Sequence, residues 1–377
     1  MARPSASSAL AFVLIAFGCD ERPPASSQPA PSPPVANAGT APTSTEATPM
    51  AAKQSLARYD VEGRSLAVSL TVDKPRVMVS EPVFATLVFS GDALEVEVGW
   101  MGDNGLGRPE NYRLAFVDAD GATLPGPDPG PQFGGQSWTV ALAPGRDHRA
   151  RLLLAHWVVG LKPGRYTLRG ETTIRVRTDA EAPWRELPVA VETPVEVVAD
   201  DAAALGRIFR ELGAVAVGER HDAASEALRQ LEVVRDPQVI PEWLRIAELP
   251  DYAHKFAAAR ALALWDDDRA LAAIVRIAAT QAADLPAVGY ATEALRAQSA
   301  AQLRVAAAQA LATSPHRDAR SALLALKDDP EPSVRLTVVH RLAKLTDPAA
   351  HALLTAFAAD GDATVRGEAR RYMAERR

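Results

Sequence analysis

A nine-residue segment recurs three times near the end of the chain at a fixed spacing. The copies are residues 303–311, 334–342 and 365–373, and their matched arginines lie 31 residues apart, since 335 − 304 = 31 and 366 − 335 = 31. Self-similarity at this period is typical of a solenoid, in which a repeat buries its apolar face only by stacking on its neighbours. The sequence therefore predicts an all-α array of stacked helices.

The array extends toward the middle of the chain. Residues 254–262 align with the three copies, although 304 − 255 = 49 residues separate this copy from the next one. We expect residues 279–299 to supply the longer unit. Alanine and leucine dominate at helical spacing from about residue 200 onward, so the solenoid is predicted over residues 201–377.

Two motifs in the array carry a family resemblance. Asp-Asp-Pro-x-x-x-Val-Arg at 328–335 and Asp-Gly-Asp-Ala-x-Val-Arg at 360–366 resemble the short bacterial form of HEAT repeats, over about residues 203–377. In that family an aspartate before the second helix of a repeat and an arginine that opens this helix form a ladder between repeats. The resemblance implies a structural ladder made of Asp329 with Arg335 and Asp362 with Arg366.

A second set of matched positions is the candidate binding surface. The residues six after each repeat start are Arg260, Gln309, His340 and Arg371, and helical geometry places them off the core stripe. Solenoids bind partners through extended surfaces, so these four residues are candidate contacts for a partner. The alternative is a face that is merely solvated, as most charged surface positions are.

Residues 59–200 have a different pattern. Short runs of alternating apolar and polar residues are separated by Gly, Pro and Asp turns, which predicts about eight antiparallel strands in an all-β, immunoglobulin-like sandwich. The segment Leu-Lys-Pro-Gly-Arg-Tyr-Thr-Leu at 161–168 resembles a turn and strand of exported bacterial immunoglobulin-like domains, with Tyr166 as a corner residue. This resemblance concerns the fold and implies no function.

One stretch in this region has the start of a calcium loop. Asp118-Ala119-Asp120-Gly121 lacks the later oxygen ligands and the glutamate of the full loop, so we expect a hairpin turn. The segment 120–137 that follows is long for a connection inside a domain, and long loops are often functional. It contains no convergent set of acid and base groups.

The N-terminus is predicted to be a targeting signal for export. A positive residue and a short apolar run make residues 1–18 a secretory signal peptide. Ala16-Phe17-Gly18-Cys19 resembles a bacterial lipobox, in which the cysteine is lipidated and the chain is cleaved before it. The alternative is an ordinary signal peptide that is cut nearby and leaves a free thiol. The resemblance implies a protein anchored through lipid on the periplasmic face of the outer or inner membrane.

The next segment, residues 19–58, is rich in Pro, Ala, Ser and Thr, and has almost no bulky apolar residues. Such a segment cannot bury enough surface to offset its ordering entropy, so we expect a disordered linker. Cys19 is the single cysteine of the chain, which excludes an internal disulfide.

The sequence contains no catalytic constellation. There is no G-x-S-x-G, P-loop or H-E-x-x-H motif, and the histidines lack the spacing of metal ligands. The net charge of −6 gives no reason to expect a nucleic-acid partner. We therefore expect a non-enzymatic scaffold or adaptor that needs no cofactor or metal and binds another protein through the solenoid. The alternatives are a regulator or inhibitor of an envelope protease that uses the loop 120–137, and an enzyme with a site at the domain junction.

Overall fold

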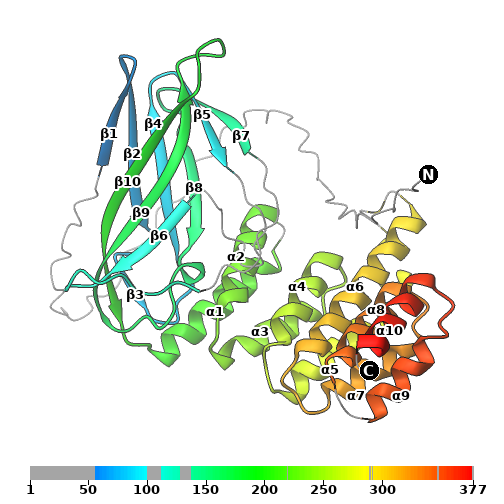
Figure 1. The fold of residues 1–377 in the computed structure, drawn as a ribbon. Coiled ribbons are helices and arrows are strands. Elements are labelled where there is room, and N and C mark those ends of the chain that lie inside the picture. Colours follow the sequence, from blue (N-terminus) through cyan, green and yellow to red (C-terminus); the bar gives the residue numbers. More distant parts are fainter. Residues whose placement is uncertain are drawn as a thin grey trace, which may run out of the picture. The chain divides into compact units, whose positions relative to one another are not determined.

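The computed structural model describes residues 56–99, 112–127, 137–218, 220–287, 290, 292–345 and 348–375. The predicted signal peptide, Cys19 and nearly all of the predicted linker lie outside the described residues. All described elements belong to one compact unit, residues 51–377. A region of strands is followed by a region of helices (Figure 1).

The strand region consists of two sheets, with ten strands among the described residues. One sheet has the order β1 (Leu56–Val61), β2 (Arg64–Val72), β4 (Phe84–Gly91) and β8 (His148–Leu153). The other has the order β3 (Arg76–Met78), β10 (Arg185–Val198), β9 (Gly164–Arg177), β5 (Leu94–Gly99) and β7 (Ser137–Leu142), while β6 (Tyr112–Val117) also pairs with β9. Their pairing is antiparallel except between β3 and β10.

The alternating sequence of β9 and β10 places one face of each strand in the core. Burial alternates residue by residue along both strands, as expected where every second side chain points to the same side. A Cβ atom added to Gly170 in β9 would lie 3.3 Å from Leu70 in β2 and 3.6 Å from Leu87 in β4. The two sheets therefore face each other across a single shared core.

The first strand corrects the predicted linker boundary. β1 begins at Leu56, so residues 56–58, predicted as linker, belong to a strand that pairs with β2. Glu62 and Gly63 join the two strands and have positive φ angles of 55° and 82°, the backbone of a two-residue hairpin turn. The polar residues of β1 lie on its exposed face, which is why its composition resembled a linker.

Two predicted turns are present. The Tyr166 hydroxyl donates a hydrogen bond to the Lys162 carbonyl at 3.0 Å, the contact expected of a corner tyrosine. Oδ1 of Asp118 accepts hydrogen bonds from the amides of Asp120 and Ala122, and Gly121 has a φ angle of 83°. The Asp-Ala-Asp-Gly stretch is therefore a hairpin turn, as predicted.

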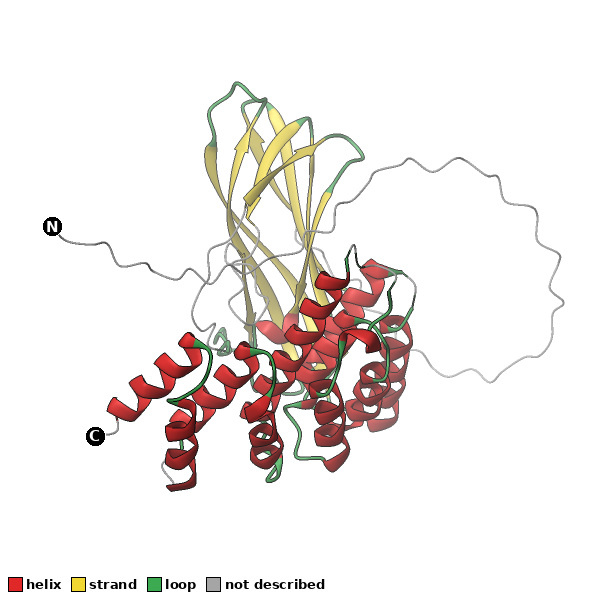
Figure 2. Cartoon of the chain, turned by 90° about the vertical axis from the view of Figure 1, so that its right-hand side faces the viewer, coloured by secondary structure: helices red, strands yellow, loops and turns green. Residues whose placement is uncertain are grey.

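The helices follow as pairs (Figure 2). The last strand ends at Val198 and the first helix begins at Ala202. The pairs are α1 (Ala202–Ala216) with α2 (His221–Val233), α3 (Ile240–Ala247) with α4 (Tyr252–Leu262), α5 (Asp268–Ala278) with α6 (Glu293–Thr313), α7 (Ala319–Leu324) with α8 (Pro332–Ala343), and α9 (Pro348–Phe357) with α10 (Ala363–Glu375). Successive even-numbered helices also pack on each other, so the pairs stack in one direction.

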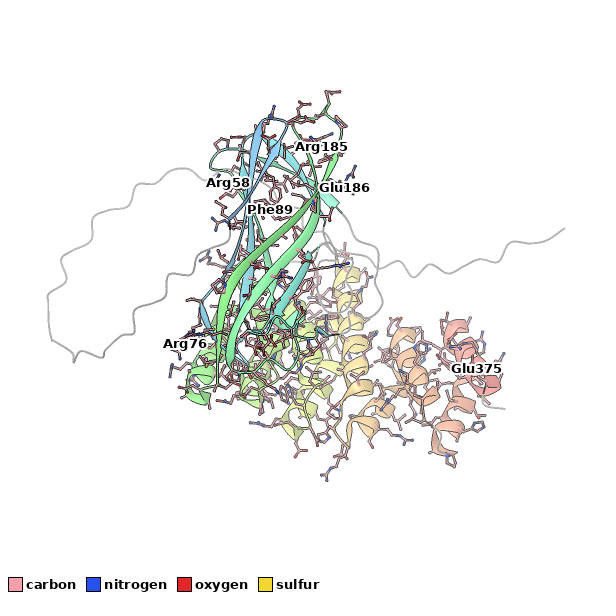
Figure 3. The ribbon with its side chains drawn as sticks, turned by 60° about the vertical axis from the view of Figure 1, so that its left-hand side comes forward. Arg58, Arg76, Phe89, Arg185, Glu186 and Glu375 are labelled. Atoms are coloured by element: carbon pink, nitrogen blue, oxygen red, sulfur yellow. The ribbon has the colours of Figure 1, made fainter. Side chains whose placement is uncertain are left out.

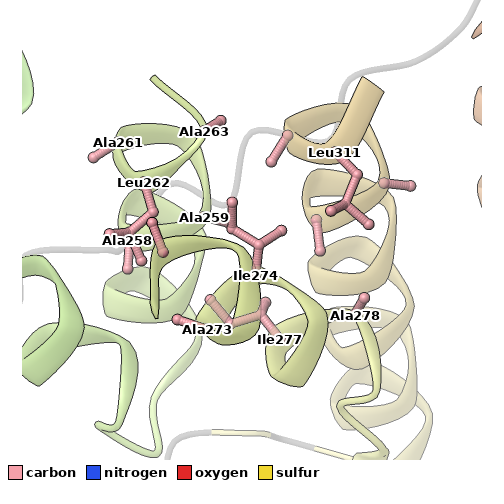
Figure 4. Close-up of a cluster of buried hydrophobic side chains, with 14 of the residues drawn as sticks. Ala258, Ala259, Ala261, Leu262, Ala263, Ala273, Ile274, Ile277, Ala278 and Leu311 are labelled. Atoms are coloured by element: carbon pink, nitrogen blue, oxygen red, sulfur yellow. The ribbon is translucent and has the colours of Figure 1, made fainter. Parts of the chain in front are cut away.

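Small side chains allow the helices to approach closely. Figure 4 shows Ala258, Ala259 and Leu262 of α4 beside Ile274 of α5 and Leu311 of α6, and all of them are buried. Several helices start at a side-chain cap, since Asp201, Asp251, Asp267 and Thr292 each accept a hydrogen bond from an amide in the first turn.

The long unit between the second and third helix pairs comes from α6. This helix starts at Glu293, 303 − 293 = 10 residues before the repeat copy that it contains. A short 3₁₀ turn at Ala282–Asp284 precedes it. The segment predicted to hold the additional residues therefore supplies this turn and an N-terminal extension of the helix.

Candidate functional site

Buried arginines connect the helix pairs of the array. Arg304 in α6 contacts Asp329 at 3.0 Å, and both side chains are less than 10% exposed. Arg335 in α8 contacts Asp360 at 2.8 Å, and these side chains are 15% and 9% exposed. The separation is equal in both cases, since 329 − 304 = 25 and 360 − 335 = 25, so the contact repeats with the sequence period.

The same arginines also bind backbone carbonyls. Nη1 of Arg304 donates to the Thr280 carbonyl at 3.2 Å, and Nη1 of Arg335 donates to the Asp329 carbonyl at 2.7 Å. Nη1 of Arg366 donates to the Asp360 carbonyl at 2.5 Å. Each arginine therefore contacts the connection that precedes its own helix. Arg304 and Arg335 also contact the corresponding connection in the next helix pair, through Asp329 and Asp360.

The predicted ladder needs correction. Asp329 and Arg335 both belong to it, but the predicted ion pair between them is wrong: the Asp329 carboxylate contacts Arg304, and Arg335 reaches Asp329 only through its backbone carbonyl. The second ladder acid is Asp360, which contacts Arg335, and not Asp362. Oδ1 of Asp362 accepts hydrogen bonds from the amides of Thr364 and Val365, so this side chain caps α10. The reason is the spacing: Asp360 precedes Arg366 by six residues, as Asp329 precedes Arg335, whereas Asp362 precedes it by four.

The four candidate binding residues lie on successive even-numbered helices. Arg260 is on α4, Gln309 on α6, His340 on α8 and Arg371 on α10, and all four are exposed. Because α4, α6, α8 and α10 pack side by side, matched positions on them form one row across the array. We call these four residues the polar row.

The cations of the polar row lie beside acids. Arg260 lies 3.9 Å from Glu232 of α2, and Nη1 of Arg371 lies 2.7 Å from Glu375. Glu368 of α10 is shared, because it lies 2.5 Å from Arg371 and 3.8 Å from His340. The two arginines of the row are therefore paired with acids, so the row is not a basic stripe.

Two pKa shifts accompany this arrangement. The hydrogen bond from Arg371 holds the pKa of Glu368 below its usual range. Burial lowers the pKa of His340, although the nearby Glu368 opposes the shift. His340 is therefore neutral at pH 7 and can donate or accept a hydrogen bond, and its ring meets Tyr372 edge-on at 5.9 Å.

An apolar row runs beside the polar row. The residues four positions earlier are Phe256, Val305 and Leu336, one helical turn away on the same side of each helix. All three are only half-buried, although they pack against the core. The face of the even-numbered helices thus offers apolar and polar side chains in parallel lines, a combination that sequence reasoning did not predict.

The repeat position occupied by the polar row also occurs on α2, outside the row, and sequence reasoning missed it. Arg229 of α2 lies 260 − 229 = 31 residues before Arg260, and its guanidinium lies 5.9 Å above the Phe84 ring of β4. The signal was available, because Leu231 and Leu262 are also 31 residues apart. The contact with β4 shows that the first helix pair uses this position to meet the strand region.

The loop proposed for the alternative function is only partly described. Residues 128–136 lie outside the described residues. In the described part, the Leu124 amide donates to the Phe116 carbonyl at 2.8 Å and the Val159 amide donates to the Pro125 carbonyl at 3.0 Å. These bonds hold the start of the segment against the edge of the sheet.

Among the described residues, no group of three or more His, Cys, Asp or Glu side chains is placed to hold a metal ion. Within the same residues, every helix is too short or too polar to cross a membrane.

Stacked helix pairs with a repeated buried arginine define the helical region as a helical-repeat solenoid. Residues 290–374 match the family model described as HEAT repeats. The match confirms the predicted HEAT repeats over these residues, which include α6 to α10 from Glu293 almost to the end of α10. A comparison with curated proteins found no match to the chain.

Proposed function

We propose that this protein is a non-enzymatic scaffold of the bacterial cell envelope that holds another protein on the face of its even-numbered helices. The observation that carries the proposal is the pair of parallel rows on α4, α6 and α8, one polar and exposed, the other apolar and half-buried. HEAT repeats are commonly protein-interaction scaffolds.

The chemistry of the rows fits a protein partner. Half-buried Phe256 and Leu336 offer apolar area that a partner would remove from water, which favours association. The paired charges of the polar row favour a partner that offers both acidic and basic groups, which sets orientation more than affinity. Because the rows cross several helices, we expect the binding energy to be spread over them.

The location of the protein in the cell envelope is part of the same proposal. Lipidation at Cys19 after removal of residues 1–18 would anchor the protein in the envelope, and residues 19–55 would act as the tether. We further propose that the two facing sheets form an immunoglobulin-like sandwich; the shared core and the corner hydrogen bond of Tyr166 support this assignment.

The test is a proximity-labelling capture from envelope membranes with three proteins: the wild type, a triple variant Phe256→Ser, Leu336→Ser and Arg260→Glu, and a control Arg276→Glu. Arg276 is an exposed residue of α5 and lies away from the rows. We expect the triple variant to lose specific partners that the wild type and the control both retain. Circular dichroism of each variant establishes that its helices are intact.

Retention of every partner by the triple variant would contradict the scaffold proposal. Loss of the same partners on deletion of 120–137 would then favour the alternative, a regulator or inhibitor of an envelope enzyme that acts through the strand loops. The two outcomes concern different parts of the chain, so they are distinguishable.

A further inference from the structure

A cavity of about 290 Å³ lies where the strand region meets the first helix pair. One wall comes from the chain around β3 and the start of β4, and the other from α1 and α2. We call it the junction pocket. Its lining residues are Asp73, Lys74, Glu81, Pro82, Val83, Ile208, Glu211, Leu212, Val215 and Gln230.

The walls of the junction pocket are tied together by polar contacts. Nε2 of Gln230 donates to the Pro82 carbonyl at 2.7 Å. The amide and hydroxyl of Ser80 donate to the Asp200 carboxylate at 2.9 and 2.7 Å, two residues before α1 begins. Arg151 contacts Glu226 of α2 at 3.1 Å as well as Asp73. The pocket is therefore preformed by bonds on several sides.

One part of the pocket is apolar. Ile208, Leu212 and Val215 follow each other along one side of α1 at helical spacing, opposite the buried Pro82 and Val83. Val215 is 44% exposed, although valine is usually buried. A ligand with an aliphatic segment would remove this apolar area from water.

The charged part of the pocket has an excess of carboxylates. Lys74 is bound to Glu81, whose side chain is only 4% exposed and also accepts a hydrogen bond from the Met78 amide. Arg151 contacts both Asp73, at 3.3 Å, and Glu226, at 3.1 Å. In the described part of the chain, no ion pair involves Glu211, and Arg207 one turn earlier on α1 does not reach it. The four charged lining residues sum to −2.

We propose that the junction pocket takes the aliphatic cation of a partner protein, namely the side chain of a lysine or arginine. The alkyl segment would lie along Leu212 and Val215, and the cationic group would lie between Asp73 and Glu211. The volume is near the lower end for ligand pockets and suits a single side chain. The inference rests on the proposed function only in taking the ligand from a protein partner, because the polar and apolar rows lie on other helices.

The experiment follows the methyl NMR signals of Ile208, Leu212 and Val215 in the whole protein during titration with three capped tripeptides. Their central residues are lysine, norleucine and glutamate in otherwise identical peptides. We expect saturable shifts of these methyl groups with the lysine peptide, at millimolar concentrations, because one side chain offers few binding atoms. Norleucine has the same alkyl chain without the ammonium, so its shifts should be much weaker.

Two variants test the Glu211 carboxylate and the apolar wall of the junction pocket. Glu211→Gln should weaken binding of the lysine peptide about threefold, the effect expected for one exposed charge. Val215→Trp should fill the pocket and abolish the shift of Ile208. The matched control is Glu186→Gln, an exposed carboxylate of β10 that Figure 3 places at the end of the strands away from Arg76. This control should bind as the wild type does.

Equal binding of the norleucine and lysine peptides would overturn the proposal, as would an unchanged affinity in Glu211→Gln. Tighter binding of 1,5-diaminopentane than of the lysine peptide would also overturn it, since that result would assign the pocket to a free diamine. Because the rows and the pocket are separate, a triple variant of the rows that loses its partners but still binds the lysine peptide would uphold both proposals. If the lysine peptide does not bind while the triple variant still loses its partners, only the proposal for the junction pocket is contradicted.

Discussion

Arg335 bonds to two successive turns of the solenoid at once, donating to the Asp360 carboxylate at 2.8 Å and to the Asp329 carbonyl at 2.7 Å. Asp329 in turn accepts from Arg304 through its carboxylate. One aspartate therefore serves two arginines, one through its side chain and one through its backbone. The hydrogen bond from Arg335 holds the pKa of Asp360 below its usual range.

The first prediction concerns the most buried of these pairs. Replacement Arg304→Leu keeps apolar bulk but leaves the carboxylate of Asp329 buried without its guanidinium. We expect the free energy of unfolding of the helical region to fall by about 3 kcal/mol, because breaking a buried pair leaves an uncompensated charge. Urea unfolding followed by helical circular dichroism measures the change.

The control for this prediction is Arg276→Leu. Arg276 lies 2.6 Å from Glu248, but both side chains are more than half exposed. Exposed pairs contribute little, so we expect a change within about 0.5 kcal/mol. Equal effects of the two substitutions would show that burial does not set the strength of the ladder.

The second prediction is a pH dependence at the junction of α1 and α4. The ring of His254 lies 2.5 Å from the Asp251 carboxylate and 2.6 Å from the Ala216 carbonyl, and both groups only accept, so both ring nitrogens carry protons. The hydrogen bond to Asp251 raises the pKa of His254 above 6.5. The stabilisation is therefore complete below pH 6.5 and is lost as the pH rises through the raised pKa.

A comparison with His254→Gln measures this effect. Glutamine can still donate to the Ala216 carbonyl but does not titrate, so the stability advantage of the wild type should shrink as the pH rises above neutrality. Thermal unfolding across the pH range provides the measurement. An advantage that stays constant with pH would mean that folding does not raise the pKa of His254.

The third prediction concerns a close backbone approach in the strand region. A Cβ atom at Gly91 would lie 2.3 Å from the Ser65 carbonyl oxygen, closer than any real contact. Gly91→Ala should therefore destabilise the pairing of β2 with β4 by about 1–3 kcal/mol, the usual range for overpacking. Hydrogen exchange at the amides of these two strands should report the loss directly, and unchanged protection would refute it.

The fourth prediction is a glycine substitution that stabilises the fold, in contrast to the third. Gly367 lies in the interior of α10, is exposed and has no atom within 4 Å of an added Cβ. Gly367→Ala should stabilise the last helix by about 0.5–1 kcal/mol, because alanine loses less backbone entropy in a helix. An increase in helical signal at intermediate urea checks it, whereas a decrease would show that this position needs glycine.

The fifth prediction tests the proposed lipid anchor at Cys19. Cys19→Ser removes the thiol that a lipid would occupy, so the protein should move from the membrane fraction to the soluble fraction of the envelope. Mass spectrometry of the N-terminal peptide of the wild type should show acyl chains on Cys19. A wild-type peptide with a free thiol would instead support an ordinary signal peptide.

The repeat made the helical region the most predictable part of the fold. The 31-residue period placed α8 and α10, and the resemblance to HEAT repeats identified Arg335 as a ladder residue. The choice of Asp362 was wrong because a local motif was followed in place of the period, and 360 − 329 = 31 would have selected Asp360. Strand β1 was missed because its exposed face is polar and it lies beside a proline-rich segment.

Other features of the candidate sites depend on tertiary packing. Phe256, Val305 and Leu336 occupy the same position of the aligned repeat copies, but they form one half-buried row only because α4, α6 and α8 pack side by side. The junction pocket combines residues around Asp73 with residues around Glu211, which are more than a hundred positions apart and belong to no repeat. Such contacts follow from tertiary packing alone.

The equal spacing of the ladder makes the array modular. Excision of residues 335–365, which number 31, would place Arg366 six positions after Asp329, the separation that Arg335 now has. Arg304 would keep its carboxylate, and every remaining arginine would keep a backbone carbonyl. Duplication of the same block would extend the chain of bonds by one link. The length of this solenoid can therefore change by whole repeats during evolution without leaving a buried charge unpaired.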